Sequence, residues 1–381
     1  MEAIREHIRI GFVIDAIDDW QAGTEQQLRK ILRALDRTKF EPKLYFLRPS
    51  LHLRPEDFPC PVHIASWRPQ VKWYRPTGLA DLVRSFRSWR PHIVQTFFRD
   101  GTYYGTLAAR IARVPTVVIS VRNAGHWEGG IDHLALKVVY RLADFFQCNS
   151  RSVAESLTTS SGIPPARIEV LPNAMDLSHF APATTAERVA ARERLGLPLD
   201  APVFVSLANL RPVKDHATLI EAASLVRRDL ATAQFLLVGE GPLRPALESQ
   251  ASKLSLNTCV RFLGGQADVR PFLAAADLGL LTSRSEASSN SVVEYIAMGL
   301  PAVLSDIPGN RDLADGMFFK PGDPAGLATK ILELWNDSGL RERMQDEYRG
   351  RAKAYSLEAL TRRAEAYYTR LATGIVTMVP C

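Results

Sequence analysis

The amino-acid sequence predicts an α/β protein made of two doubly wound, Rossmann-like domains and a C-terminal helix. The chain has 381 residues, which at about 100–200 residues per domain favours two domains. Short apolar, β-branched runs alternate with longer amphipathic stretches, a pattern typical of βαβ units with mostly parallel sheets. The alternation is interrupted once, at residues 171–198, and then starts again.

The first domain is predicted to span residues 1–180. Strands are expected at residues 8–14, 43–47, 93–96, 116–120 and 145–149, with a further strand-like run at 167–171. Helices are expected at residues 24–35, 79–88, 106–111 and 151–157. The join to the next domain contains Pro172, Pro182 and a patch rich in threonine and alanine.

The second domain is predicted to span residues 181–355. Its strands are expected at residues 203–208, 234–238, 260–263, 278–282 and 302–305, and its helices begin near Ala217, Leu243, Val269, Asn290 and Asp323. A last amphipathic helix, residues 356–371, lies in a C-terminal segment of residues 356–381. Ligands of open parallel sheets bind beyond the carboxyl ends of the strands, so two such domains facing each other would form a cleft.

Composition excludes several classes of protein. Hydrophobic residues make up 46% and charged residues 23%, which excludes disordered and fibrous chains. The four cysteines have no CxxC spacing, which argues against a zinc ribbon or a disulfide scaffold and suits a reducing cytoplasm. Charges within residues 2–9 interrupt any signal-peptide core, and no apolar run is long enough to span a bilayer. We expect a soluble protein, or one that rests on a membrane surface.

The formal charge of +6 is unevenly distributed. Residues 1–180 carry 24 basic and 18 acidic side chains, whereas residues 181–381 carry 23 of each. Residues 68–90 hold six basic side chains and one acidic one, interleaved with aromatic residues. This segment is either a core-facing helix stripe with a solvated basic face, or a contact for anionic lipid or a diphospho-lipid acceptor. No recognised nucleic-acid-binding fold accompanies the charge, so nucleic acid is disfavoured.

The sequence matches neither of two common nucleotide-binding motifs. The turn at residues 239–244 reads Gly-Glu-Gly-Pro-Leu-Arg, with Arg244 where a dinucleotide fingerprint needs glycine or alanine and Pro242 where its helix would open. A tight structural turn is the better interpretation, and a nicotinamide-dependent dehydrogenase is disfavoured. No GxxxxGK[ST] and no Asp-x-Asp occur, so carboxylate-held Mg²⁺ is not indicated.

The segment from Leu281 to Asp306 contains the strongest candidates for ligand-binding residues. A strand ends at Thr282, a polar loop carries Glu286, and a helix opens at Ser289–Asn290. The backbone N–H groups of Asn290 and Ser291 would be available to a phosphate. Glu294, one turn further, is suited to accept two hydrogen bonds from a sugar or ribose diol. The alternative is that both glutamates are solvated surface charges.

Two cations follow the first strand of the same domain. Arg211 and Lys214 lie between that strand and the next helix, where they would form a diphosphate clamp. Taken alone, each would be an ordinary surface charge.

These pieces, in order, resemble the retaining, nucleotide-sugar-dependent glycosyltransferases of the GT-B fold, known as glycosyl transferases group 1. The matching motifs are Ala22-Gly23-Thr24-Glu25, residues 170–176 (Val-Leu-Pro-Asn-Ala-Met-Asp) with Phe180, Arg211-Pro-Val-Lys214, residues 238–242, the E-x7-E pair Glu286 and Glu294, and Gly299-Leu-Pro301.

The resemblance implies that Arg211 and Lys214 hold the diphosphate, Glu294 the ribose and Glu286 the transferred sugar. Gly23, Thr24, Asn290 and Ser291 would complete the nucleotide-sugar site. It also implies that the C-terminal helix packs back toward the first domain, and that no metal and no cofactor other than the nucleotide diphosphate sugar is required.

Three positions depart from the family pattern. Ala287 and Ala22 stand where the family usually has glycine. The family's usual acceptor-side histidine motif is not evident, and Arg122, Asn123 or His126 would fill that role.

The expected function is retaining transfer of a hexose or N-acetylhexosamine, from a UDP-sugar in preference to a GDP-sugar, to an acceptor hydroxyl in glycan, glycolipid or polysaccharide biosynthesis. Partners would be the donor, a glycan or lipid-linked acceptor and an anionic membrane surface, at a cytoplasmic or peripheral membrane location. The rival functions are a nucleotide-sugar 2-epimerase, which would convert the donor alone, and an inactive nucleotide-sugar-binding scaffold.

Overall fold

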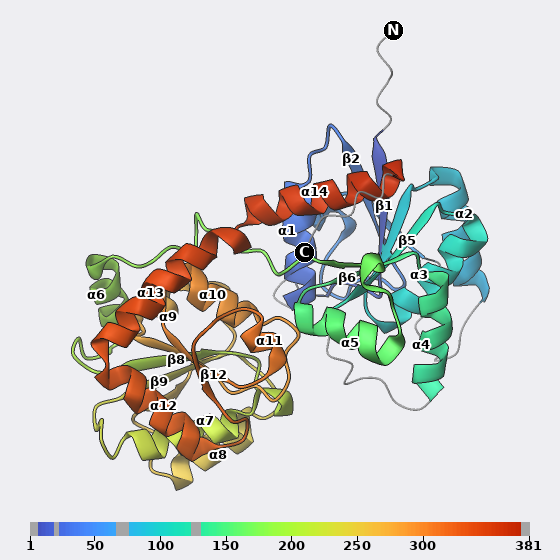
Figure 1. The fold of residues 1–381 in the computed structure, drawn as a ribbon. Helices are drawn as coiled ribbons and strands as arrows, with labels where there is room; N and C mark the ends of the chain where they lie inside the picture. Colours follow the sequence, from blue (N-terminus) through green and yellow to red (C-terminus); the bar gives the residue numbers. More distant parts are fainter. Residues whose placement is uncertain (1–6, 19–22, 66–75, 123–130, 375–381) are drawn as a thin grey trace. The chain divides into compact units, whose positions relative to one another are not determined.

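The computed structural model describes residues 7–18, 23–65, 76–122 and 131–374, and its chain divides into two compact units (Figure 1). Unit 1 comprises Met1–Ala174 and Leu357–Cys381, and unit 2 comprises Met175–Ser356. Each unit contains one parallel sheet with helices between its strands, which confirms the predicted α/β class and the two Rossmann-like domains.

Unit 1 contains a seven-stranded sheet in the order β3-β2-β1-β4-β5-β6-β7, and every pairing is parallel. The strands are β1 (Ile8–Ile14), β2 (Phe40–Phe46), β3 (Val62–Ile64), β4 (Ile93–Thr96), β5 (Thr116–Val121), β6 (Phe145–Cys148) and β7 (Ile168–Val170). The helices are α1 (Gly23–Ala34), α2 (Pro76–Trp89), α3 (Arg99–Ala112), α4 (Ile131–Leu142), α5 (Arg151–Ser161) and α14 (Leu357–Thr373), with 3₁₀ turns η1 (Pro55–Asp57) and η2 (Pro165–Arg167).

The C-terminal helix α14 belongs to unit 1, where it packs on α1, β1 and β4. Its buried side chains recur every three or four residues, the spacing of one helical face, and include Leu360, Ala364, Tyr368 and Leu371. The Tyr368 ring meets the edge of Phe12, and its hydroxyl donates to Gln95 Oε1 at 2.7 Å. The expected return of the last helix to the first domain is thus confirmed.

Unit 2 contains a six-stranded parallel sheet in the order β10-β9-β8-β11-β12-β13. Its strands are β8 (Val203–Leu207), β9 (Gln234–Val238), β10 (Val260–Phe262), β11 (Leu278–Leu281), β12 (Ala302–Ser305) and β13 (Met317–Phe319). Its helices are α6 (Thr185–Arg194), α7 (His216–Val226), α8 (Arg244–Lys253), α9 (Arg270–Ala275), α10 (Asn290–Met298), α11 (Pro308–Arg311), α12 (Pro324–Asn336) and α13 (Ser338–Ala352), with 3₁₀ turns η3 (Pro212–Lys214) and η4 (Lys353–Tyr355).

A buried ion pair fastens α6 to the sheet of unit 2. Arg192 on α6 is 2% exposed, and its guanidinium donates to Asp277 Oδ2 at 2.8 Å and to the carbonyls of Leu199 and Ala201 at 2.6 and 3.0 Å. Asp277 also accepts from the backbone N–H of Val203 at 2.7 Å, at the start of β8. The Arg192 and Asp277 side chains are 3% and 14% exposed, and each has several partners, which a largely buried pair needs to offset its desolvation.

Both sheets contain one point where the strand order reverses direction. In unit 1 it lies between β1 and β4, and in unit 2 between β8 and β11. Loops that leave adjacent strands in opposite directions open a crevice at the carboxyl edge, where doubly wound proteins bind ligands. The two switch points therefore indicate where each unit binds.

Among the residues described, no helix is both long and apolar enough to cross a bilayer.

Candidate functional site

The switch point of unit 2 brings together the two loops that carry the predicted donor-binding residues. Arg211 and Lys214 follow β8, and the segment from Thr282 to Glu286 follows β11. The backbone N–H of Arg284 donates to the carbonyl of Val213 at 2.8 Å, and Thr282 Oγ1 donates to the carbonyl of Lys214 at 2.8 Å. Two hydrogen bonds to backbone carbonyls thus hold the loops together.

Lys214 and Glu286 form an ion pair at this junction. The Lys214 ammonium donates to Glu286 Oε1, which also accepts from Ser283 Oγ at 2.6 Å. The two side chains are 24% and 11% exposed, so the pair is only partly screened by water. The Arg211 side chain is exposed, and no described residue forms an ion pair or side-chain hydrogen bond with its guanidinium. One cation is therefore fixed and the other is available to a ligand.

Asp215 and Arg284 were missed by the motif analysis. Asp215 has φ 49°, in the left-handed region that aspartate tolerates better than most residues, and it is buried. Its Oδ2 accepts from Thr218 Oγ1 and from Arg284, each at 2.9 Å. These contacts hold the chain immediately after Lys214. A polar residue at a strand-to-helix turn was the available signal.

Helix α10 begins at Asn290, as predicted. Its N-cap residue, Ser289, makes no side-chain capping bond, so its side chain does not occupy the first-turn amides. Ser291 Oγ donates to the carbonyl of Leu207 at the end of β8, which fixes the helix start against the neighbouring strand. Asn290 and Glu294 are half-buried. The helix N-terminus thus lies at the same switch point as Lys214.

Gly309 allows the loop with Glu286 to approach α11. A Cβ at this position would lie 2.1 Å from the carbonyl oxygen of Glu286, closer than any real contact. We expect Gly309→Ala to destabilise unit 2 by about 1–3 kcal/mol through overpacking and to lower turnover by displacing Glu286. Thermal unfolding and initial rates measure the two effects.

Gly350, in α13, is the matched control because nothing lies within 4 Å of a Cβ built there. Gly350→Ala should raise stability by up to about 1 kcal/mol, the difference in helix propensity. Equal behaviour of the two variants would contradict the close approach at Gly309.

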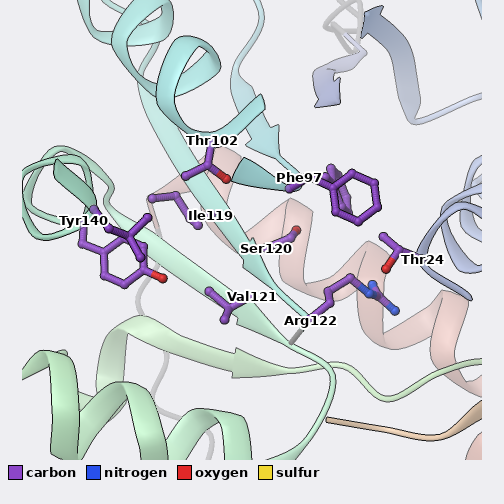
Figure 2. Close-up of a pocket in the computed structure, with 10 residues that line it drawn as sticks. Thr24, Phe97, Thr102, Ile119, Ser120, Val121, Arg122 and Tyr140 are labelled. Carbon is purple, nitrogen blue, oxygen red and sulfur yellow. The ribbon is translucent and has the colours of Figure 1, made fainter. Parts of the chain in front are cut away.

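A pocket lies at the switch point of unit 1 (Figure 2). Its lining residues come from α1, from the β4–α3 connection and α3, from β5 and the residue after it, and from α4: Thr24, Phe97, Phe98, Thr102, Ile119, Ser120, Val121, Arg122, Leu136 and Tyr140. Phe98 has φ 56° and ψ −178°, a region that residues other than glycine rarely adopt and that costs about 1–3 kcal/mol. Such strain is concentrated at functional sites, which supports a binding role for this pocket.

Arg122 supplies the charge of this pocket. Its guanidinium donates to Asn173 Oδ1 at 2.7 Å, and burial lowers the pKa of the side chain to about 10. Arg122 therefore remains cationic at neutral pH. Gly23, exposed, and Thr24, half-buried, open α1 nearby. Asn123 and His126, the other acceptor-side candidates, lie outside the described residues.

Asp15 follows β1 at the same edge and was also missed. Its Oδ1 accepts from the backbone N–H of Gly101 at 2.6 Å. Burial and the charge of Asp100 raise the pKa of Asp15 to about 6, against the opposing effects of the Gly101 bond, Arg48 and Arg99. A carboxylate directly after the first strand of a doubly wound sheet was the available signal.

The basic segment of unit 1 is described from Pro76 onward, and residues 66–75 lie outside the described part. On α2, Leu82, Val83 and Phe86 are buried, which confirms the core-facing stripe. Arg84, Arg87 and Arg90 are exposed.

The described residues contain no group of three His, Cys, Asp or Glu side chains that could hold a metal ion.

The arrangement of two doubly wound parallel sheets is the fold of the GT-B proteins. The structure of HepE from Anabaena, in complex with UDP, matches 96% of this chain and all of that chain with a TM-score of 0.82 at 20% identity. WaaG, a glycosyltransferase involved in lipopolysaccharide biosynthesis, matches 94% of this chain and 99% of that chain with a TM-score of 0.72 at 17% identity.

Two family models then cover most of the chain. Residues 22–179 match Glycosyltransferase Family 4, and residues 201–337 match Glycosyl transferases group 1. The chain is a GT-B glycosyltransferase, as its motifs indicated.

Curated relatives match over part of their length. The lipopolysaccharide core biosynthesis glycosyltransferase LpsE of Rhizobium meliloti (strain 1021) is 32% identical over 241 residues, 61% of this chain and 66% of that protein. The UDP-Gal:α-D-GlcNAc-diphosphoundecaprenol α-1,3-galactosyltransferase of Escherichia coli is 27% identical over 278 residues, 69% of this chain and 71% of that protein. The matches span about two thirds of each relative.

Proposed function

We propose that the protein transfers a hexose or N-acetylhexosamine from a UDP-sugar to an acceptor hydroxyl in the biosynthesis of a glycan, glycolipid or polysaccharide. One observation supports this proposal above all. The Lys214–Glu286 ion pair and the start of α10 lie at the same switch point of unit 2, and Arg211 lies in the loop that carries Lys214. The structure of HepE with UDP and glucose, the lipopolysaccharide role named for LpsE and the lipid-linked acceptor named for the Escherichia coli relative support it.

Each residue then has a chemical task. The bond between the anomeric carbon and the diphosphate breaks, its electron pair goes to a β-phosphate oxygen, and the acceptor oxygen bonds to the anomeric carbon. Arg211, Lys214 and the first-turn amides of α10 stabilise the negative charge that develops on the phosphate, without a metal or cofactor. Glu286 binds hydroxyls of the transferred sugar, Glu294 the ribose, and Gly23 and Thr24 the donor.

The stereochemical outcome we propose is retention. The departing phosphate takes the proton of the acceptor hydroxyl on the face where the bond breaks, so no covalent nucleophile is needed. Glu286, bonded to Lys214 and Ser283, serves as a ligand of the sugar in this scheme.

A two-stage experiment tests the function. Thermal shifts with UDP-sugars and GDP-sugars should show stabilisation by the UDP series, since a ligand of the native state raises its stability by mass action. Incubation of the stabilising donor with acceptor extracts should then release UDP and give a product with the donor's anomeric configuration, followed by NMR. Conversion of the donor without an acceptor would indicate an epimerase instead, and binding without any turnover would indicate a scaffold.

We also propose that the basic face of α2 rests on an anionic membrane, where a lipid-linked acceptor lies. Each arginine near such a surface contributes about 1 kcal/mol, so the double variant Arg84→Ser/Arg87→Ser should weaken binding to phosphatidylglycerol vesicles about thirty-fold. Co-sedimentation at low salt measures this.

The control is Arg228→Ser/Lys253→Ser, which removes two exposed charges from unit 2. Equal losses in both double variants, or binding that is insensitive to salt, would count against a membrane contact through α2.

A further inference from the structure

A chain of hydrogen bonds through three fully buried side chains, Ser283, Ser305 and Asn310, leads to the carboxylate of Glu286. From these contacts we infer that the three residues position the carboxylate so that one of its oxygens is left for the transferred sugar. They are positioning residues, because they act through Glu286. The inference rests on the proposed transferase function, in which Glu286 binds hydroxyls of that sugar.

The two oxygens of the Glu286 carboxylate have different surroundings. Oε1 accepts from the Lys214 ammonium and from Ser283 Oγ, the latter at 2.6 Å. No residue in the described part of the chain donates a hydrogen bond to Oε2. A carboxylate oxygen accepts about two hydrogen bonds, so the capacity of Oε1 is used. Oε2 is therefore the oxygen that accepts from a sugar hydroxyl.

Ser283 is the donor that stays with Glu286 when a ligand engages Lys214. In the proposed reaction the Lys214 ammonium binds the diphosphate, so the phosphate competes with Glu286 for that donor. Ser283 is 0% exposed, so its hydroxyl is enclosed by protein and a ligand does not compete for it. The bond from Ser283 then keeps the carboxylate within the narrow range of positions, about 0.5 Å, that a binding group requires.

Ser305 and Asn310 hold Ser283 in turn. Ser305, the last residue of β12, donates from Oγ to the carbonyl of Ser283 at 2.6 Å. Asn310, on α11, donates from Nδ2 to the carbonyl and to Oγ of Ser305, at 2.9 and 3.1 Å. Because the Ser305 hydroxyl accepts from Asn310, its single proton is directed to the Ser283 carbonyl. The loop that carries Glu286 is thus joined to β12 and α11.

The test compares the affinity for UDP with the affinity for a UDP-sugar. Isothermal titration with UDP-glucose, UDP-galactose and UDP-N-acetylglucosamine identifies the sugar that the unaltered protein binds most tightly. Ser283→Ala should weaken binding of that UDP-sugar roughly tenfold, the lower end of the range for a hydrogen bond to a charged group, and leave the affinity for UDP unchanged. Ser283→Cys, which is close in size and keeps a weak donor, should lie between the two.

A double-mutant cycle separates positioning from a general structural effect. In a Glu286→Ala background there is no carboxylate to position. Ser283→Ala should therefore cause no further loss of UDP-sugar affinity in that background. A structural effect of the serine, independent of Glu286, would instead add to the effect of Glu286→Ala.

Ser305→Ala tests the next bond of the chain, and it does so even if Ser283→Ala folds poorly. It removes the donor to the Ser283 carbonyl, so it should weaken the UDP-sugar about two- to tenfold, the net scale of a neutral hydrogen bond, without changing the affinity for UDP. The control is Ser224→Ala, which removes a hydroxyl-to-carbonyl bond of 2.7 Å inside α7 and should leave both affinities unchanged.

Three results would overturn the inference: unchanged UDP-sugar affinity in Ser283→Ala, equal weakening of UDP and UDP-sugar in that variant, or additive effects in the cycle. Failure of the proposed function is distinguishable, because the unaltered protein would then bind neither UDP nor any of the three UDP-sugars, and the inference would fall with it.

Discussion

Replacing Lys214 with alanine should lower turnover roughly 100-fold, and replacing Arg211 with alanine should do the same, because each removes a donor that stabilises the charge developing on the leaving phosphate. The stability effects should differ. Arg211 is exposed, so its removal should leave the melting temperature unchanged. Lys214 is bonded to Glu286, which is 11% exposed, so its removal leaves a largely buried carboxylate with only the Ser283 hydroxyl. Steady-state rates and thermal unfolding of both variants measure these outcomes.

Lys253→Ala, at an exposed lysine of α8 in the same unit, is the control for a general loss of positive charge. It should keep normal turnover and stability. Near-normal turnover in both Lys214→Ala and Arg211→Ala would contradict the proposal that these two residues bind the diphosphate.

Replacing Asp277 with alanine should destabilise unit 2 by about 3–5 kcal/mol, because it leaves the buried guanidinium of Arg192 without its carboxylate. The change also removes the acceptor of the Val203 N–H at the start of β8. For a domain of this size the melting temperature should fall on the order of 10 °C. Differential scanning calorimetry is the appropriate measurement.

The control for Asp277 is Asp306→Asn, which breaks the exposed pair with Arg311. Exposed pairs contribute about 0–1 kcal/mol, so this variant should unfold close to the unaltered protein. A loss of similar size in both variants would show that the burial of Arg192 does not set the cost of losing Asp277.

The sequence predicted most strands, because buried parallel strands read as short apolar runs between turn residues. β3 (Val62–Ile64) and β13 (Met317–Phe319) were not predicted. All four edge strands have only three residues, which leaves little periodic signal, and of these only β7 and β10 were predicted. α3 begins at Arg99, seven residues before its predicted start, because its first turns contain Gly101 and Thr102, which are poor helix formers held by tertiary packing.

The interpretation of residues 239–244 as a tight turn is confirmed by packing. A Cβ on Gly239, where φ is 150°, would lie 2.0 Å from the carbonyl oxygen of Ala208. A Cβ on Gly241 would lie 2.5 Å from that of Leu210. These glycines are needed for the close approach of two backbones, a reason that spacing alone does not reveal.

The candidate site was predictable in its parts but not in its contacts. Arg211, Lys214, Glu286 and Asn290 were identified because they follow strands or open a helix. The pairing of Lys214 with Glu286 joins residues 72 positions apart and depends on β8 and β11 being neighbours, which no local pattern specifies. Asp15 and Asp215 were not identified as site residues for the same reason, because their role depends on the residues that pack against them.

The discontinuity of unit 1 has a consequence for how the protein is made. Its last element, α14, leaves the ribosome after the whole of unit 2, roughly 10–40 s after Ala174 at bacterial to eukaryotic rates of synthesis. During that interval the apolar surface that later receives Tyr367, Tyr368 and Leu371 is open, beside Phe12 and Leu28. Unit 2 is continuous and is complete before α14 is synthesised. The second domain is therefore expected to mature first on the ribosome, and a nascent chain arrested before Leu357 should be the species that chaperones capture.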